Sequence, residues 1–140
     1  FGLLHAGSLD CGTNVIATTG CAAAEYGDPF VIMGNQRTMH FSASQKLDLG
    51  YISSGTVATH ASGSTIYALS PLELGGQSKY AIKVPTGSST RTYWLEFRQP
   101  IGFDSGMSAF PNTGAQFRIT SPFDVICGSC DSGSNDTVKL

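Results

Sequence analysis

From Tyr51 onward, short runs of β-branched, aromatic and apolar residues alternate with clusters of Gly, Ser, Thr and Pro. Such runs are typical of strands, and the small polar residues between them are typical of turns. We expect strands at residues 55–60, 65–69, 79–84, 92–98, 116–119 and 124–127. Because half-buried strands need neighbours, the pattern predicts an antiparallel β-rich subdomain over residues 53–140.

Two short polar segments, Ser62-Gly63-Ser64 and residues 86–89, are predicted hairpin loops. The run at residues 93–98 is expected to be a central strand with one polar face. Glu96 and Arg98 are two residues apart and therefore share a face of that strand. This placement favours a structural ion pair or a surface charge over a catalytic role.

The first 35 residues sustain no apolar period of two or of 3.6, and they are expected to be irregular. A short helix is predicted at residues 42–49, where Ser42 is the N-cap and Gln45 completes a capping box. Gly50 is a natural stop for it. The expected fold class is mainly β, with an irregular N-terminal loop region and one short helix.

Composition narrows the class of partner. Charged residues make up 13% of the chain, about half the usual share, while 41% of residues are hydrophobic. The formal net charge of −2 gives no electrostatic reason to bind nucleic acid or an anionic membrane. No apolar run reaches the roughly 18 residues that a membrane span needs. A loop-rich extracellular β protein fits this composition best.

Four cysteines allow three disulfide pairings. Cys11 and Cys21 bracket a short flexible segment that a local bridge would hold closed. Cys127 and Cys130 form a C-x-x-C, which suits a redox dithiol, half of a zinc ribbon or a structural disulfide loop. No helix is expected after Cys130, and Cys11 and Cys21 are too far apart to complete a ribbon. Two structural disulfides are therefore the preferred interpretation.

The segment Gly2-Leu3-Leu4-His5 matches the last four positions of the zinc-binding string H-E-x-x-H-x-x-G-x-x-H. In that string, Gly breaks a helix so that a third His can bind the metal. Met33 follows in a turn, and the predicted helix comes after it. Asp10, Glu25 and Asp28 lie near His5 along the chain, and Asp28 before Pro29 is explained as a turn initiator.

In this order and spacing, the chain resembles the gametolysin-like family of secreted metzincin metallopeptidases from residue 1 to about residue 120. The segment around Met33 is similar to the Met-turn of metzincins. The matching strings are F-G-L-L-H-A at residues 1–6, E-Y-G-D-P-F at 25–30, I-M-G-N at 32–35, F-S-A-S-Q-K-L-D-L-G-Y-I at 41–52, Y-A-L-S-P-L-E at 67–73 and Y-W-L-E-F-R-Q-P at 93–100.

The resemblance implies a zinc endopeptidase in which His5 is the third metal ligand, Gly2 makes the bend and Met33 forms the floor of the site. Residues 1–52 would be the C-terminal part of the catalytic site. The other two His ligands and the catalytic Glu are expected before residue 1, so no catalytic residue is assigned in this chain. By itself it is expected to bind zinc weakly and to be inactive. The implied substrates are polypeptides of the extracellular matrix or cell wall.

The alternatives differ in class. The chain could be a non-catalytic β-rich binding or structural module derived from such a peptidase, with Tyr93, Trp94 and Phe97 as a binding face or as core. His5 could be a packing residue, and His40 or His60 a replacement ligand. The apolar start of the chain would favour self-association. No G-x-S-x-G elbow or Gly-rich phosphate loop is present.

Overall fold

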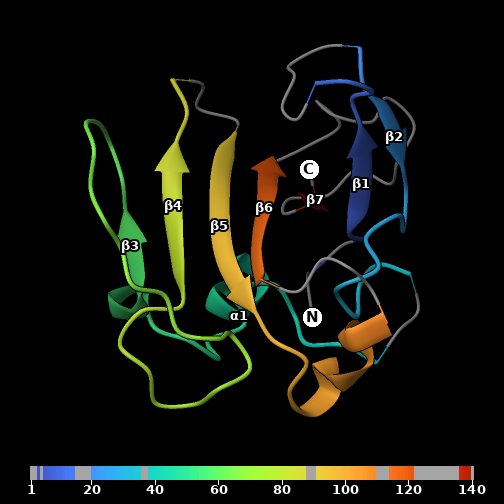
Figure 1. Ribbon diagram of the computed structural model, residues 1–140. Helices are drawn as coiled ribbons and strands as arrows, with labels where there is room; N and C mark the ends of the chain where they lie inside the picture. The colour runs from blue at the N-terminus through green and yellow to red at the C-terminus, as the bar shows by residue number, and fades with distance from the viewer. Residues whose placement is uncertain are drawn as a thin grey trace.

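The computed structural model describes residues 3, 5–14, 20–35, 38–87, 91–109, 114–121 and 136–139. Its strands form a seven-stranded sheet in the order β2-β1-β7-β6-β5-β4-β3 (Figure 1). The fold is mainly β with one short α-helix, which confirms the predicted class. The strands are β1 (Gly7–Asp10), β2 (Ala22–Ala24), β3 (Val57–Thr59), β4 (Ala81–Pro85), β5 (Thr92–Arg98), β6 (Gly114–Ser121) and β7 (Asp136–Lys139).

The centre of the sheet is antiparallel, and its two flanks are mixed. β5 pairs antiparallel with β4 and with β6, placing Leu95 between Ile82 and Phe117. β3 runs parallel to β4, and β1 runs parallel to β7. β5 is thus the predicted central strand, with the predicted bounds. β1 and β2 occur where an irregular segment was expected, and the division at residue 52 stays a prediction.

The parallel pairing of β3 and β4 overturns two local predictions. Residues 65–69 form no strand, and Ser62–Ser64 is not a hairpin loop. A parallel neighbour needs a long crossover connection, and residues 60–80 supply it. Ile66 is 98% exposed there, so this apolar run is not covered by the sheet. The strands on either side of the predicted loop at 86–89, β4 and β5, form an antiparallel pair, and residues 88 and 89 of that loop lie outside the described residues.

The helix α1 (Ala43–Asp48) forms as its sequence predicts. The Ser42 hydroxyl accepts from the Gln45 N–H, and the Gln45 side chain accepts from the Ser42 N–H at 3.1 Å. Gly50 has φ +74°, which ends the helix in the left-handed region. Two 3₁₀ helices, η1 (Ser54–Thr56) and η2 (Gly102–Ala109), complete the described elements.

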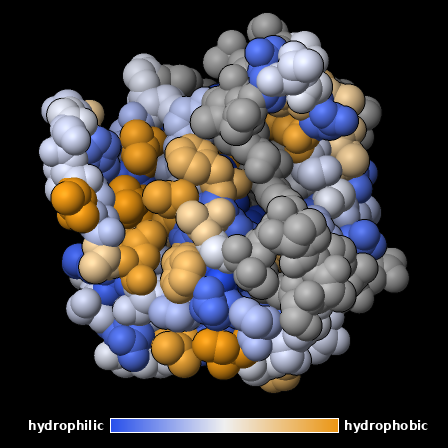
Figure 2. All heavy atoms as spheres, viewed as in Figure 1, coloured by the Kyte–Doolittle hydropathy of each residue, from blue (hydrophilic) through white to orange (hydrophobic). Residues whose placement is uncertain are grey.

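The core lies between α1 and the face of β5 that bears Trp94, Glu96 and Arg98. Its apolar part is the cluster Ala43, Leu72, Tyr80, Ala81 and Trp94. The charged residues of β5 are on the more buried face, because that face packs beneath α1 and the loop before it. The other face carries half-buried Tyr93, Leu95 and Phe97, and Figure 2 shows apolar side chains gathered over β4 and β5.

Candidate functional site

Both ring nitrogens of His5 have side-chain partners. Nδ1 lies 2.7 Å from Oε1 of Glu25, and Nε2 lies 2.6 Å from the hydroxyl of Tyr26. If Nδ1 carries the proton, it donates to Glu25, and Nε2 accepts from Tyr26. The His5 and Glu25 side chains are 28% and 34% exposed, so the cluster opens to solvent. The Tyr26 ring also stacks on the imidazole, with centroids 3.9 Å apart.

The turn after β2 brings these partners to His5. Tyr26 has φ +56°, an uncommon value for a residue with a side chain. Gly27 follows it, and a Cβ there would lie 2.8 Å from the Ala24 carbonyl oxygen and closer still to the Ser8 hydroxyl. Only glycine fits this approach to β1. The turn thus fixes Tyr26 and Glu25 against the segment that carries His5.

The predicted Met-turn lies directly beside the same segment. Ala6 donates its N–H to the Met33 carbonyl at 2.9 Å and accepts from the Asp28 N–H at 3.2 Å. The loop from Asp28 to Asn35 closes on itself, since the Asn35 N–H donates to the Asp28 carbonyl at 2.9 Å. A Cβ on Gly34 would lie 2.0 Å from that carbonyl oxygen, so glycine is required there as well. Met33 is half-buried within this turn.

Buried ion pairs attach this loop to the sheet. Asp28 on the loop and Arg118 on β6 are both fully buried and form an ion pair. Arg98 on β5 donates to the Phe30 carbonyl at 3.0 Å. Glu96 joins the two arginines, accepting from Arg118 Nε at 2.9 Å and from Arg98 at 3.1 Å. The loop that carries Met33 is therefore held by side chains from two central strands.

The same network reaches α1 and η2. The second carboxylate oxygen of Glu96 accepts from the Ala43 N–H at 2.7 Å, at the start of α1. Arg98 Nε lies 2.8 Å from a carboxylate oxygen of Glu73 and 2.8 Å from one of Asp104. Asp104 in turn accepts from the backbone N–H of His40 at 2.7 Å. One charged cluster thus fixes the relative positions of loop, helix and sheet.

Burial and charge set the protonation of this cluster. Burial raises the pKa of Glu73 to about 7, and its hydrogen bond with Asp104 adds to the shift, against the opposing effect of Arg98. For Glu96, burial favours the neutral acid, but Arg118 and Arg98 outweigh it and hold the pKa below the usual value. At neutral pH, Glu96 is therefore ionised and Glu73 is partly protonated.

The structure brings together some of the predicted site residues and leaves others apart. His5 and Met33 are joined through Ala6, and Cys11 and Cys21 form the predicted disulfide. His60 lies 3.2 Å from the Tyr67 hydroxyl, and His40 lies beside η2 with its ring against Phe103. The predicted roles of Gly2, Cys127 and Cys130, and of the apolar start at Phe1, Gly2 and Leu4, concern positions outside the described residues.

No sequence pattern pairs Glu25 or Tyr26 with His5. Glu25 is a neighbour of His5 only in the sense that it lies near it along the chain, and Tyr26 belongs to one of the matching strings. They are 20 and 21 residues from His5, so no local spacing reports the contact. Asp28 is indeed a turn residue, accepting from the Phe30 N–H at 2.8 Å, but its pairing with Arg118 is a tertiary contact. Glu96 and Arg98 form the predicted structural ion pair.

The donor set around His5 fits one ligand of a zinc site. A metal-binding His commonly donates its second ring N–H to a carboxylate, which orients the ring and raises its basicity. Glu25 on Nδ1 is placed for that role, which would leave Nε2 for a metal if Tyr26 moved away. Among the described residues, no group of three or more His, Cys, Asp and Glu side chains could hold a metal. In a zinc site, these residues would offer one ligand and its supporting carboxylate.

Comparisons with known protein families, with curated proteins and with solved structures found no match for this chain. In the part of the chain that the structure describes, no helix has the length and apolar character needed to cross a membrane.

Proposed function

We propose that this chain is part of a secreted zinc metalloendopeptidase of the gametolysin-like metzincin type, with His5 as a zinc ligand. The observation that carries the proposal is a pair of hydrogen bonds, from the Ala6 N–H to the Met33 carbonyl and from the Asp28 N–H to the Ala6 carbonyl, which joins the His5 segment to the predicted Met-turn. In the sequence, Ala6 lies 22 residues before Asp28 and 27 residues before Met33. Their contact in the fold is what a shared site requires.

The contact between Glu25 and His5 is a second support. Glu25 would hold the imidazole in the tautomer whose Nε2 lone pair can bind a cation. Tyr26 keeps that nitrogen hydrogen-bonded, so the Tyr26 hydroxyl would have to give way to a metal. A bound zinc ion would act as a Lewis acid toward a peptide carbonyl and lower the pKa of water.

The resemblance implies that the general base and the other two His ligands precede Phe1. In this proposal, Glu25 orients the ligand His5, and Met33 forms the floor of the site. The 140-residue chain by itself is expected to bind zinc weakly and to lack peptidase activity. Secretion is consistent with the Cys11–Cys21 disulfide, because such bonds persist in oxidising compartments.

The test begins with the residues encoded upstream of Phe1, which should spell H-E-x-x-H directly before it. A protein that includes them should hydrolyse casein or gelatin and lose that activity with a chelator. His5→Ala should remove zinc and reduce activity by about a hundredfold or more, as loss of a metal ligand does. His60→Ala is the matched control, because His60 hydrogen-bonds Tyr67 rather than the His5 cluster. It should leave both zinc content and activity unchanged.

Glu25→Gln should weaken zinc binding by roughly 10- to 100-fold while leaving the ligand itself in place. An upstream sequence without H-E-x-x-H would refute the peptidase proposal. Stoichiometric zinc and chelator-sensitive proteolysis by the 140-residue chain would instead refute the expectation that it is inactive alone.

The second candidate function is a non-catalytic binding module. Trp94 does not support a binding face on β5, because it is 6% exposed and belongs to the core cluster. The observation that favours binding is a pocket lined by residues of the Met33 loop, the segment before α1, α1 itself and η2.

A further inference from the structure

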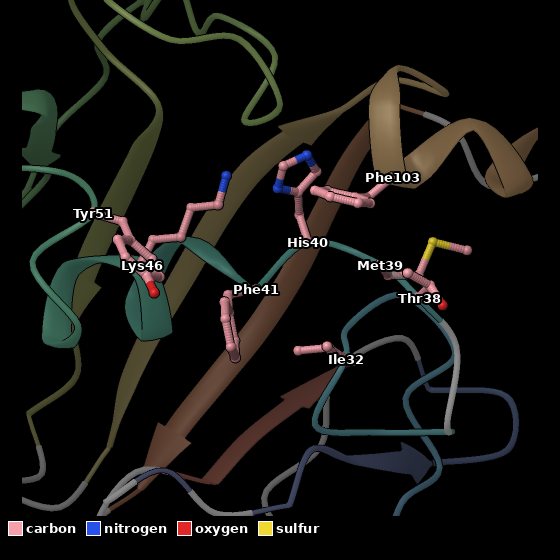
Figure 3. A pocket seen from close by; sticks show the side chains of 8 residues that line it. All are labelled: Ile32, Thr38, Met39, His40, Phe41, Lys46, Tyr51 and Phe103. Carbon is pink, nitrogen blue, oxygen red and sulfur yellow. The ribbon is translucent and has the colours of Figure 1, made fainter. Parts of the chain in front are cut away.

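A pocket of about 360 Å³ lies between the segment before α1, the end of that helix and η2 (Figure 3). Its wall is mostly apolar and is formed by Ile32, Met39, Phe41, Tyr51 and Phe103. Ile32, Tyr51 and Phe103 are 44%, 65% and 66% exposed, so large apolar side chains line an open mouth. The volume is near the lower end of the range for small-molecule sites. His5, Glu25 and Tyr26 are not among its lining residues.

Lys46 supplies a positive charge to this pocket. Its side chain comes from α1 and is directed toward His40 in Figure 3, and the residue is only 8% exposed. The ammonium donates to the Leu72 carbonyl at 2.8 Å, which uses one of its three N–H groups. Among the described residues, Lys46 forms no ion pair with a carboxylate. The nearby acids Glu73, Glu96 and Asp104 all contact Arg98 instead.

An anion beside Lys46 would offset an unfavourable environment. Burial lowers the pKa of Lys46, and the charge of Arg98 lowers it further, against the opposing effect of the nearby acids. Burial lowers the pKa of His40, and the Lys46 ammonium lowers it further against the opposing effect of Asp104, so the ring favours its neutral form and offers a hydrogen bond rather than a charge. Asp104 fixes His40 through its backbone N–H at 2.7 Å. The pocket therefore has one cationic donor, one neutral polar ring and an apolar wall.

We propose that this pocket binds a small monocarboxylate with an apolar body, whose carboxylate pairs with Lys46 and whose body contacts Phe41, Tyr51 and Phe103. An organic cation would meet the Lys46 charge without compensation. A phosphate or sulfate would present more oxygens than Lys46, His40 and Thr38 could satisfy, and the remaining oxygens would lie against the apolar wall, which is costly. A free acid about the size of one aromatic ring with a short chain suits the volume. The proposal does not depend on the peptidase assignment.

The test compares 3-phenylpropionate with its uncharged amide, 3-phenylpropanamide, by calorimetry and by backbone amide shifts. On the unmodified chain, the acid should bind about tenfold more tightly than the amide, because a buried ammonium adds a charge-assisted hydrogen bond. Shifts should centre on His40 and Phe103. A peptide ending in a free Phe carboxylate serves as a third probe.

Lys46→Met should weaken binding of the acid by about tenfold and leave that of the amide nearly unchanged. Lys79→Met is the matched control, because the Lys79 ammonium also donates to a backbone carbonyl, that of Gly55, outside the pocket lining. It should change neither affinity. Phe103→Ser should weaken both probes equally, and since Phe103 is 66% exposed this variant is expected to fold.

Equal affinity for acid and amide on the unmodified, folded chain would overturn the proposal, as would no detectable binding of the acid. These measurements do not depend on whether Lys46→Met folds. An identical loss in Lys79→Met would also contradict it, because the effect would then be general to positive charge. Tighter binding of the peptide than of the free acid would refute the assignment to a small molecule.

Discussion

Two clusters of acidic and basic side chains among the described residues, one around His5 and one around Arg98 and Arg118, differ chiefly in burial. His5, Glu25 and Tyr26 meet at the surface, where the His5 and Glu25 side chains are 28% and 34% exposed. The cluster around Arg98 and Arg118 has side chains with no exposure at all. In water, an ion pair contributes little, whereas an uncompensated charge in the interior is very costly. Charged side chains therefore contribute little to stability in the exposed His5 cluster, whereas in the buried cluster around Arg98 and Arg118 each charge needs its partner.

The difference indicates which cluster can act on a ligand. The carboxylates of the buried cluster all have partners, since they accept from guanidinium groups and from the backbone N–H groups of Ala43, His40 and Gln99. Its role is to hold α1, η2 and the Met33 loop to the sheet. The His5 cluster has open sides and is held by the turn around Gly27. The loop from Asp28 to Asn35 contacts both, through Arg118 and through Ala6.

The largest expected effect comes from breaking the buried cluster. Arg118→Leu leaves the carboxylate of Asp28 without a guanidinium partner and removes one of the two that Glu96 has, in a site with no exposure. We expect a loss of about 3–5 kcal/mol in the free energy of unfolding, measured by urea denaturation. Lys83→Leu, which removes a half-buried charge from β4, is the control and should cost much less. A similar loss in both variants would contradict the special role of burial.

A smaller effect concerns how the buried cluster depends on pH. The pKa of Glu73 is about 7 when folded and about 4.5 when unfolded, so between these values the folded state binds more protons. Its contribution to stability is present below pH 4.5 and is lost as the pH rises through 7. Glu73→Gln mimics the protonated acid and cannot lose a proton. The fall in the free energy of unfolding as the pH rises should therefore be smaller in the variant by roughly 1–2 kcal/mol, since one pKa unit corresponds to about 1.4 kcal/mol.

The measurement for Glu73→Gln is the free energy of unfolding at pH 5, 6, 7 and 8. The unmodified protein should become less stable over this range, and the variant should show a flatter profile. Two curves that run parallel would show that Glu73 does not take up the proton.

The smallest effect is expected at the exposed cluster. Glu25→Gln should change the free energy of unfolding by less than about 1 kcal/mol, because surface pairs of this kind contribute little. The His5 imidazole should nevertheless report the change, with a shift of its Nδ1 resonance in NMR. Tyr26→Phe is the matched control, since it removes the partner of Nε2 instead. A loss from Glu25→Gln as large as that from Arg118→Leu would abolish the contrast between the clusters.

Local patterns predicted part of this structure well. The capping box of Ser42 and Gln45, the stop at Gly50 and the bounds of β5 all follow from residues within a few positions of one another. The Cys11–Cys21 bridge was also expected, since it closes a short segment. The strand predicted at 65–69 was wrong, because its apolar pattern has no neighbour to pair with in a crossover connection. An alternating pattern indicates how a segment would be oriented in a sheet, but it does not indicate whether a partner strand is available.

The candidate site was predicted only in outline. His5 and Met33 were named from their strings, but Glu25 and Tyr26 were not assigned as partners of His5. Arg118 carried no signal, although its guanidinium pairs with Asp28, 90 residues away. The sequence pattern does not predict the pocket around Lys46 either, because Lys46 has the spacing of an ordinary polar residue on an amphipathic helix.

By itself, the sequence determined the helix, the central strand and the local disulfide, because hydrogen bonds and bonds between close neighbours depend on short-range spacing. Tertiary structure alone decided the strand order, the parallel pairings and the burial of the charged face of β5. It also decided that Glu25 and Tyr26 would meet His5. The physical reason is that desolvation and long-range pairing depend on which distant segments are brought together, and no local pattern contains that information.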